Sequence, residues 1–285
     1  MDLDHINWYP GHMKKSLDTI KASLKLVDIV LILVDSRIVR SSINPLLDQI
    51  IGDKKRLILL NKTDLADPKN TDEWIKYFED QGYFALGIDS KNGKNLNKIK
   101  EYSKKILSDE FKKREEKNIR SKTIRMMIVG IPNVGKSTLI NKLSKRQSAK
   151  VGNTPGLTRS NQWIRLSGDM ELLDTPGVLW PKFEDNEIGL NLAFTGAIKD
   201  NILDEENLAY RLIEKLMSLD KKILEDAYGI ESDGKETIEI MDDIARRRGA
   251  IKKKNEVDYF KVATILLDDF RKARLGRISL ESVRD

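Results

Sequence analysis

The sequence predicts an α/β fold, in which a mostly parallel sheet with helices on both faces precedes a smaller all-α domain. Short apolar runs rich in β-branched residues, typical of strands buried on both faces, alternate with segments of helical periodicity. Such alternation favours a doubly wound sheet. The strand signals stop after Gly177, and from about Glu184 the pattern is helical to the end. The predicted domains are therefore 1–180, which holds the sheet, and 181–285, which holds helices alone.

The first predicted strand, 27–34, reads V-D-I-V-L-I-L-V and is followed by Asp35. Four further strands are predicted at 56–60, 83–88, 125–130 and 170–173. Helical patterns between and after them occupy 70–81, 95–107 and 136–144. The charge-rich stretch 104–122 is expected to be an exposed helix or linker that divides the sheet region into halves. The clearest helices of the second domain are predicted at 207–216, 237–248 and 257–274.

Composition excludes several classes of protein. The chain has 285 residues and no cysteine, which excludes disulfides and thiolate metal sites and fits a reducing compartment. No apolar signal-peptide core and no membrane-spanning run are present, so we expect a cytoplasmic protein. Nothing in the pattern requires an oligomer, and a monomer is expected. The net charge of +6 favours polyanionic partners only weakly, because mixed charge is also an ordinary solvated surface.

A phosphate-binding loop is predicted at 130–138, G-I-P-N-V-G-K-S-T, between a strand and a helix. Gly130 and Gly135 allow backbone N–H groups to turn inward around phosphates at a helix N-terminus. Lys136 is expected to neutralise the β- and γ-phosphate oxygens, and Ser137 to place its hydroxyl on Mg²⁺. The residues expected to contact the nucleotide here are Asn133, Val134, Gly135, Lys136, Ser137 and Thr138.

The motif D-T-P-G at 174–177 ends another predicted strand. By itself it could be a simple turn, but together with the phosphate loop it indicates a γ-phosphate switch. Asp174 would hold Mg²⁺ through water, and the Gly177 N–H would face the γ-phosphate. In the intervening T-P-G-L-T-R, Thr158 is the expected second Mg²⁺ hydroxyl, with Thr154 as the alternative.

The motif N-K-T-D at 61–64 indicates a guanine reader. The Asp64 carboxylate can accept from guanine N1–H and its 2-amino group, whereas adenine offers neither donor and would leave that carboxylate unpaired. Asn61 is expected to tether neighbouring backbone, and the Lys62 stem to lie over the purine. A second stretch, Asp89, Ser90 and Lys91, would support the base by donating backbone N–H groups to guanine O6. Alone, N-K-T-D could cap a helix; beside a phosphate loop it predicts GTP and GDP as ligands.

The order of these motifs is rotated, because the base reader precedes the phosphate loop. Rotation is tolerated where chain termini lie close together at the surface. This order, together with W-Y-P-G-H-M-K-K at 8–15 and D-T-P-G-V-L-W-P at 174–181, resembles the circularly permuted YlqF-type GTPases over nearly the whole chain. The resemblance implies a P-loop GTPase domain and a helical RNA-binding domain. One departure is D-S-K at 89–91, where the family pattern is S-A-K.

That resemblance also implies a function. It predicts a factor for assembly of the large (50S) ribosomal subunit, which binds ribosomal precursors and rRNA with GTP and is released after hydrolysis. Mg²⁺ and K⁺ are the implied ions, with Asn133 at the K⁺ site. Val178 follows the switch glycine and cannot align water, so His12 is the candidate to do so, with Lys136 as the second catalytic residue. Slow turnover, stimulated by the ribosome, is expected.

Basic residues cluster in the helical domain and are the candidates for RNA contact. From charge alone, a solvated face is an equal alternative. The candidates are Arg246, Arg247, Arg248, Lys252, Lys253, Lys254, Arg271, Lys272, Arg274 and Arg277. Two other functions stay open at this point: a signalling GTPase whose helical tail binds a protein, and a scaffold that binds nucleotide without hydrolysis.

Overall fold

The computed structural model describes residues 11–116, 123–144, 162–166, 169–183, 185–198 and 204–284. For residues 11, 12, 114, 115 and 162 it describes the backbone alone. The predicted Mg²⁺ residue Thr158, its alternative Thr154 and the His12 side chain lie outside the described part.

A six-stranded sheet forms the centre of the larger unit, with strand order β3-β2-β1-β4-β6-β5. Five strands run parallel, and only β5 is antiparallel to its neighbour β6. The strands are β1 (Ile29–Asp35), β2 (Arg56–Asn61), β3 (Phe84–Gly87), β4 (Ile124–Gly130), β5 (Gln162–Arg165) and β6 (Met170–Asp174). In β1, the central strand, all residues but Ile32 are buried, which explains its apolar run.

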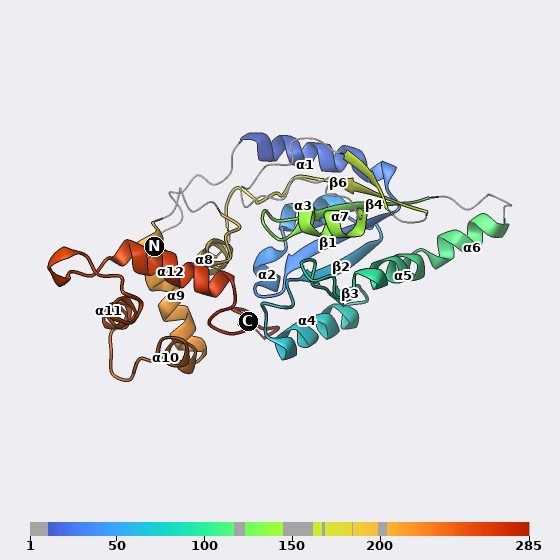
Figure 1. Cartoon of the computed structure of the whole chain (residues 1–285). Coiled ribbons are helices and arrows are strands. Elements are labelled where there is room, and N and C mark those ends of the chain that lie inside the picture. Colours follow the sequence, from blue (N-terminus) through green and yellow to red (C-terminus); the bar gives the residue numbers. More distant parts are fainter. Residues whose placement is uncertain are drawn as a thin grey trace. The chain divides into compact units, whose positions relative to one another are not determined.

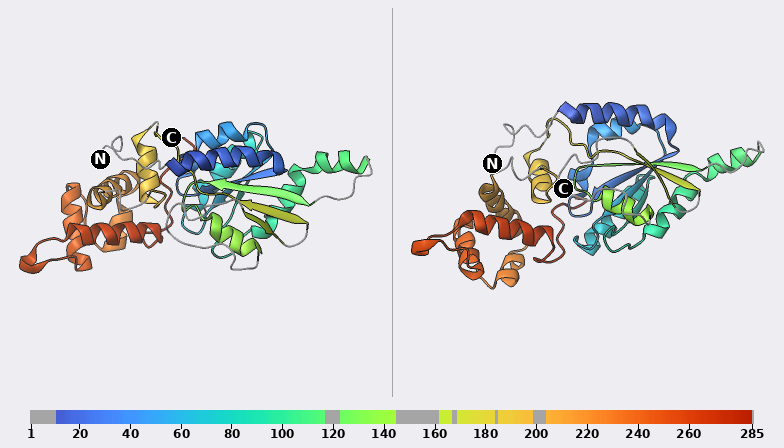
Figure 2. Two further views of the ribbon diagram at one scale, coloured as in Figure 1. Left: turned by 90° about the horizontal axis from the view of Figure 1, so that it is seen from above. Right: turned by 45° about the horizontal axis from the view of Figure 1, so that its top comes forward.

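Helices cover both faces of this sheet. Figure 2 shows α1 and α3 on one face, and α5 and α7 on the other. Helices α3 (Pro45–Ile51) and α4 (Pro68–Asp80) begin at well-formed caps, Asn44 and Asp67 respectively, and proline occupies the first turn of each. The helical segments of this unit are α1 (Gly11–Ser23), η1 (Leu24–Leu26), α2 (Val39–Ser42), α3 (Pro45–Ile51), α4 (Pro68–Asp80), α5 (Leu96–Ile106), α6 (Ser108–Glu116) and α7 (Lys136–Ser144).

The regular elements in the described part of the smaller unit are all helices, joined by loops. Its helices are α8 (Asn186–Phe194), α9 (Glu205–Leu219), α10 (Lys222–Tyr228), α11 (Thr237–Arg248), η3 (Lys253–Asn255) and α12 (Tyr259–Arg271). Helix α12 packs against α9 and α11, as Figure 1 shows, and Leu212 of α9 and Leu266 of α12 are both fully buried. Gly249 ends α11 in the left-handed conformation, and a loop with three consecutive lysines leads to α12.

The boundary between the units falls between Pro181 and Lys182, but the last residues of the chain belong to the sheet unit. That unit comprises Tyr9–Pro181 and Glu281–Asp285, whereas the helical unit extends over Lys182–Leu280. Val283 packs against the cluster of buried side chains that includes Trp74 and Phe78 of α4. Among the described residues, the expected second domain, 181–285, therefore differs from the observed unit in Pro181 and in the segment after Leu280.

The predicted fold class is confirmed, including the mostly parallel sheet and the helical region that follows it. The five predicted strands correspond to β1, β2, β3, β4 and β6. The unpredicted strand, β5, has four residues and carries the exposed Trp163, so it lacks the apolar run that marks the buried strands. Within 104–122, an exposed helix is observed as α6, and residues 117–122 lie outside the described part.

Candidate functional site

Five parallel strands bring their carboxyl ends to one edge of the sheet, where the predicted nucleotide motifs follow them. The phosphate loop follows β4, the switch follows β6, and the base reader and base support follow β2 and β3. The strand order reverses between β1 and β4, which is where doubly wound sheets bind their ligands. The fold therefore assembles at one edge the groups that the rotated sequence separates.

The phosphate loop has the backbone that an anion cradle needs. Asn133 (φ 56°) and Gly135 (φ 105°) both have positive φ, which turns successive N–H groups to one side. A Cβ on Gly135 would lie 2.3 Å from Asn61 Nδ2, so glycine is required there by space as well as by conformation. Ser137 and Thr138, in the first turn of α7, are half-buried.

Lys136 is buried and folded onto the loop that it serves. Its Nζ donates to the carbonyl oxygens of Gly130 (3.1 Å) and Ile131 (2.8 Å). Burial lowers its pKa to about 8, against the opposing influence of the nearby Asp174 carboxylate. An ammonium held in this way can exchange carbonyl oxygens for phosphate oxygens with little movement.

Asp174, at the end of β6, carries the features of a metal-binding carboxylate. It is 5% exposed, and its Oδ1 is buried without a hydrogen-bond partner in the described structure. Burial raises its pKa to about 6, although Lys136 acts in the opposite direction. A buried acceptor without a donor is costly unless a cation or water completes it, so these residues fit the Mg²⁺ that the motif implies.

The described residues hold no cluster of three or more histidine, cysteine, aspartate or glutamate side chains that could bind a metal.

Asn61 links the base reader to two other loops, as expected for a tethering residue. Its Nδ2 donates to the Val134 carbonyl oxygen (2.8 Å), and its Oδ1 accepts from the N–H (3.0 Å) and Oγ (2.8 Å) of Ser90. One buried amide thus joins the phosphate loop, the base reader and the base support. Asp64 lies on the same turn, and burial together with the nearby Asp89 raises the pKa of its carboxyl.

The base-support loop is held by its own aspartate. Asp89 Oδ1 accepts from the backbone N–H groups of Lys91 and Asn92, both at 2.9 Å. The three N–H groups that were expected to face guanine O6 already have acceptors: that of Asp89 donates to the Lys94 carbonyl oxygen (3.2 Å), that of Ser90 to Asn61 and that of Lys91 to Asp89. Asp89 therefore shapes this loop, and contact with guanine O6 requires Ser90 or Lys91 to share or exchange its acceptor.

A buried ionic network, absent from the sequence predictions, positions Lys62. Asp35, 1% exposed at the end of β1, accepts from Arg37 Nε (2.9 Å) and Nη2 (2.7 Å) and pairs with Lys62 Nζ (2.9 Å). Burial alone would raise the pKa of Asp35, but the Arg37 and Lys62 charges hold it well below its usual range. Lys62 has φ 63°, so its backbone turns sharply where the network holds its side chain.

The only sequence signal for this network is an aspartate that ends the predicted strand, followed by Arg37. Neither residue belongs to a recognised nucleotide motif. Their role depends on β1 lying beside β2, which brings Lys62 to them.

Two further contacts of the segment 35–44 were not predicted. The Asn44 Nδ2 donates to the carbonyl oxygen of Val178 (2.9 Å), next to the switch glycine. Three residues earlier, Ser41 donates through its N–H and Oγ to the buried Glu281 carboxylate in the last segment of the chain. The first contact bears on the nucleotide switch and the second anchors the chain end.

Val178 contributes backbone hydrogen bonds to the site and no polar side chain. Its side chain is fully buried, and its N–H lies 3.3 Å from the Gly130 carbonyl oxygen. The candidate water-aligning residue His12 lies at the start of α1, but its side chain is outside the described structure.

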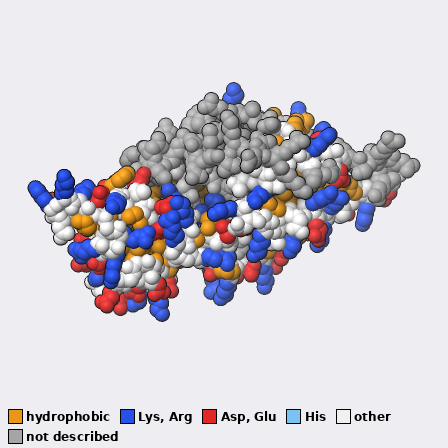
Figure 3. Space-filling model, in the orientation of Figure 1, with side chains coloured by type: hydrophobic (Ala, Val, Ile, Leu, Met, Phe, Trp, Pro, Cys, Tyr) orange, Lys and Arg blue, Asp and Glu red, His pale blue; other side chains and the backbone are white. Residues whose placement is uncertain are grey.

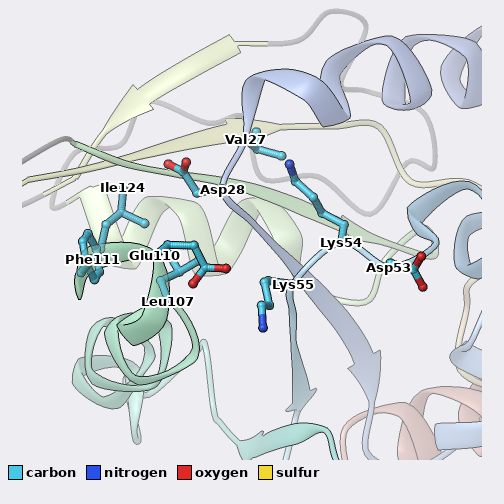
Figure 4. Close-up of a pocket in the computed structure, with 9 residues that line it drawn as sticks. All are labelled: Val27, Asp28, Asp53, Lys54, Lys55, Leu107, Glu110, Phe111 and Ile124. Carbon is cyan, nitrogen blue, oxygen red and sulfur yellow. The ribbon is translucent and has the colours of Figure 1, made fainter. Parts of the chain in front are cut away.

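A hollow of about 290 Å³ lies at the opposite edge of the sheet (Figure 4). Val27, Asp28 and Ile124 line it from the amino ends of β1 and β4, and Glu110 and Phe111 line it from α6. Because ligands of doubly wound sheets bind at the carboxyl ends of strands, this hollow is not the nucleotide site.

The structure separates the ten basic candidates of the helical unit by what they already contact. Arg271 donates to the carbonyl oxygens of Phe194 and Ala193 at the end of α8, both at 2.9 Å. Arg248 and Arg274 each lie 2.8 Å from the buried Asp269. These three arginines are committed to contacts inside the unit, which narrows the set expected to reach RNA.

The remaining candidates are more open. Lys272 pairs with Asp268 (2.7 Å), Arg246 with Asp243 (3.2 Å) and Lys252, at 3.9 Å, with Asp258. Arg277 is exposed. Arg247, Lys253 and Lys254 are exposed and form no ion pair with any residue that the structure describes. Figure 3 shows lysine and arginine side chains gathered at the end of the helical unit where the α11–α12 loop lies.

Comparisons with known proteins agree with the geometry. The family model described as "50S ribosome-binding GTPase" matches residues 125–243, which include the phosphate loop and the switch. Ribosome biogenesis GTPase A of Priestia megaterium is 44% identical over 97% of this chain and 96% of its own length. The protein of the same name from Thermotoga maritima is 31% identical over 98% of this chain and 95% of its length.

Solved structures are also similar. YlqF from T. maritima in its GNP-bound form has a TM-score of 0.66 and 28% identity, covering 95% of this chain and 99% of that one. A GDP-bound YlqF has a TM-score of 0.67 over 94% and 100% of the two chains. No helix in the described part of this chain is long and apolar enough to cross a membrane.

Proposed function

Because the chain belongs to the family of ribosome biogenesis GTPase A (YlqF), a family of guanine-nucleotide-binding GTPases, we propose that it assists assembly of the large (50S) ribosomal subunit. In this proposal it binds a subunit precursor and its rRNA when GTP is bound, and leaves after hydrolysis. The proposal is supported by two features of one chain: the guanine-nucleotide motifs follow strands at one edge of the sheet, and the helical unit carries surface cations that pair with no acidic residue in the described structure. A monomer is sufficient, since every proposed site residue belongs to one chain.

The proposed site residues act on GTP as follows. Lys136 leaves its two carbonyl acceptors and neutralises the phosphates, while the Gly177 N–H meets the γ-phosphate. Asp174, with the hydroxyl of Ser137, is the proposed holder of Mg²⁺, which would screen phosphate charge when bound. Thr158 is the proposed second hydroxyl.

Water activation is proposed for His12, because the buried, apolar Val178 offers no polar side chain beside Gly177. Asn133 is the proposed K⁺ contact. Hydrolysis is expected to be slow in the free protein and faster on the ribosome. Replacement of His12 by alanine should lower turnover and leave GTP affinity unchanged; unchanged turnover would exclude it as the water-activating residue.

RNA contact is proposed for the α11–α12 loop and its surroundings. Arg247, Lys253 and Lys254 have no acidic partner in the described structure, so they can neutralise phosphates without first breaking an ion pair. Phe260, in the first turn of α12, is 57% exposed and can stack on an unpaired base. Lys272, Arg246, Lys252 and Arg277 are proposed to contribute more weakly.

Sedimentation tests the proposal. The protein, loaded with a non-hydrolysable GTP analogue or with GDP, is centrifuged with 50S precursors and with mature subunits. We expect co-sedimentation with precursors under the analogue and release under GDP. Replacement of Arg247, Lys253 and Lys254 together by glutamine should weaken binding to the precursors and make that binding less dependent on salt concentration. Failure of the wild-type protein to sediment with either particle in either state would refute the proposal.

A further inference from the structure

Asn44 is a buried polar side chain, 3% exposed, that no nucleotide motif contains. Its Oδ1 accepts from the Leu46 N–H (3.0 Å), which caps α3. Its Nδ2 donates to the Val178 carbonyl oxygen (2.9 Å), 134 residues further along the chain. A helix cap needs only the acceptor oxygen of the side chain, so the Asn44 NH2 group is available to donate to Val178.

The residue that Asn44 holds adjoins the proposed γ-phosphate sensor. Gly177 lies against the phosphate loop so closely that a Cβ would meet Pro132 Cα at 2.7 Å and Lys136 Nζ at 2.9 Å. On its N–H side, Val178 is bonded to the Gly130 carbonyl oxygen (3.3 Å). On its carbonyl side, Val178 is bonded to Asn44. The backbone that follows Gly177 is thus held both by the phosphate loop and by Asn44.

The segment that precedes Asn44 is held by buried hydrogen bonds. The Asp35 N–H donates to Ser42 Oγ (3.1 Å), and Ser42 Oγ donates to the Ile38 carbonyl oxygen (2.7 Å), which closes the turn after β1. Through Asp35 this segment also binds Lys62 of the base reader. Asn44 therefore follows directly after the buried turn that also holds Lys62 of the base reader.

We propose that Asn44 is a positioning residue for the γ-phosphate sensor. By fixing the Val178 carbonyl it pre-orders the Gly177 backbone, so GTP does not have to order the switch on binding. Pre-ordering raises the affinity of the ligand that uses the ordered state and leaves the other unchanged. GTP contacts the sensor through its γ-phosphate and GDP lacks that group, so Asn44 favours GTP over GDP. This inference rests on the proposed role of Gly177.

Three substitutions separate the two roles of Asn44. Asn44→Ser and Asn44→Asp both keep an oxygen that can cap α3, but serine is too short to bridge to Val178 and aspartate has no donor. Asn44→Ala removes both contacts. The matched control is Asp204→Ala, which removes the cap of α9 (Asn207 N–H to Asp204 Oδ1, 3.1 Å) in the helical unit, which contains none of the nucleotide motifs.

The measurement is the dissociation constant of each full-length variant for a non-hydrolysable GTP analogue and for GDP, with Mg²⁺. For Asn44→Ser and Asn44→Asp we expect about threefold to tenfold weaker analogue binding, the equivalent of one buried hydrogen bond, with GDP binding within about twofold of wild type. Asn44→Ala should show the same loss and a lower melting temperature. Asp204→Ala should lower the melting temperature alone.

The outcomes distinguish the inference from the role on which it rests. Gly177→Ala is expected to abolish the preference for the analogue, because its Cβ collides with the phosphate loop. If Gly177→Ala keeps the wild-type preference, the sensor role and this inference both fail. If Gly177→Ala loses it while Asn44→Ser and Asn44→Asp bind both nucleotides as wild type does, only the inference on Asn44 fails. Equal weakening for GDP and the analogue would also overturn it.

Discussion

Replacement of Asp35 by asparagine tests the buried network that positions the base reader. Asp35 accepts three bonds from two cations, Arg37 and Lys62, and its side chain and that of Arg37 are each only 2% exposed. Asparagine has no charge and one acceptor oxygen, so both cations would lose their counter-ion. Breaking a buried ion pair in this way costs about 3–5 kcal/mol. We expect the free energy of unfolding of the sheet unit to fall by that amount.

The assay is urea unfolding of the nucleotide-free protein, followed by hydrogen exchange of β1 and β2 amides. The control is Asp169→Asn, which makes the same chemical change in an exposed pair: Asp169 and Lys100 are 3.4 Å apart and each more than 40% exposed. Exposed pairs contribute about 0–1 kcal/mol, so this variant should be nearly as stable as wild type. A loss below about 1 kcal/mol for Asp35→Asn, or one equal to the control, would refute the reasoning.

The same network has a defined pH dependence. The pKa of Asp35 lies well below its usual range, because the Arg37 and Lys62 charges outweigh the effect of burial. Its contribution to stability is therefore fully present above the ordinary aspartate pKa, near 4, and is lost only as the pH falls towards the lower folded value. The stability difference between wild type and Asp35→Asn should persist unchanged from pH 5 to neutrality.

Three further results are expected. Burial lowers the pKa of Lys136 to about 8 and raises that of Asp174 to about 6, so both side chains are charged between these pH values. GTP–Mg²⁺ affinity should therefore be greatest between pH 6 and 8, and should fall about tenfold per pH unit above 8 as Lys136 loses its proton. Calorimetry that gives the same affinity from about pH 5 to 9.5 would contradict this. Replacement of Glu281 by alanine removes the acceptor of a buried N–H, so exchange of the Ser41 amide should rise about tenfold or more, and unchanged exchange would exclude this anchor. Phe260→Ala should weaken binding of single-stranded RNA by about fivefold or more without changing its salt dependence, whereas alanine at the exposed Leu219 should have no effect.

Local patterns predict most of this fold because buried parallel strands need apolar runs whatever their neighbours are. The run 27–34 becomes β1 and 56–60 becomes β2, each within two residues of the predicted bounds. Strand β5 is not predictable in this way, since it gains its partners only by pairing antiparallel with β6. Similarly, Glu281 looks like an ordinary surface charge until the chain end returns to Ser41.

The candidate site likewise contains residues that the sequence identifies and residues that only the fold identifies. Gly135, Lys136 and Asn61 can be identified from the sequence because each acts within a short motif whose spacing is set by its chemistry. The internal contacts of Arg271 and Arg274 cannot be identified from the sequence, because the sequence does not tell whether a basic side chain faces solvent or a buried acceptor. Charge can be counted along a chain, but its availability depends on what the fold places beside it.

By itself, the sequence determined that this protein binds a guanine nucleotide on a rotated α/β domain, because the phosphate cradle and base reader are local motifs. Only the tertiary structure decided how those motifs are joined. Asn61 reaches Val134, Asp35 holds Lys62, and Asn44 holds Val178. Each of these contacts joins residues that lie at, or follow, the carboxyl ends of different strands. Such partners become visible only once parallel strands have brought their carboxyl ends to one edge of the sheet.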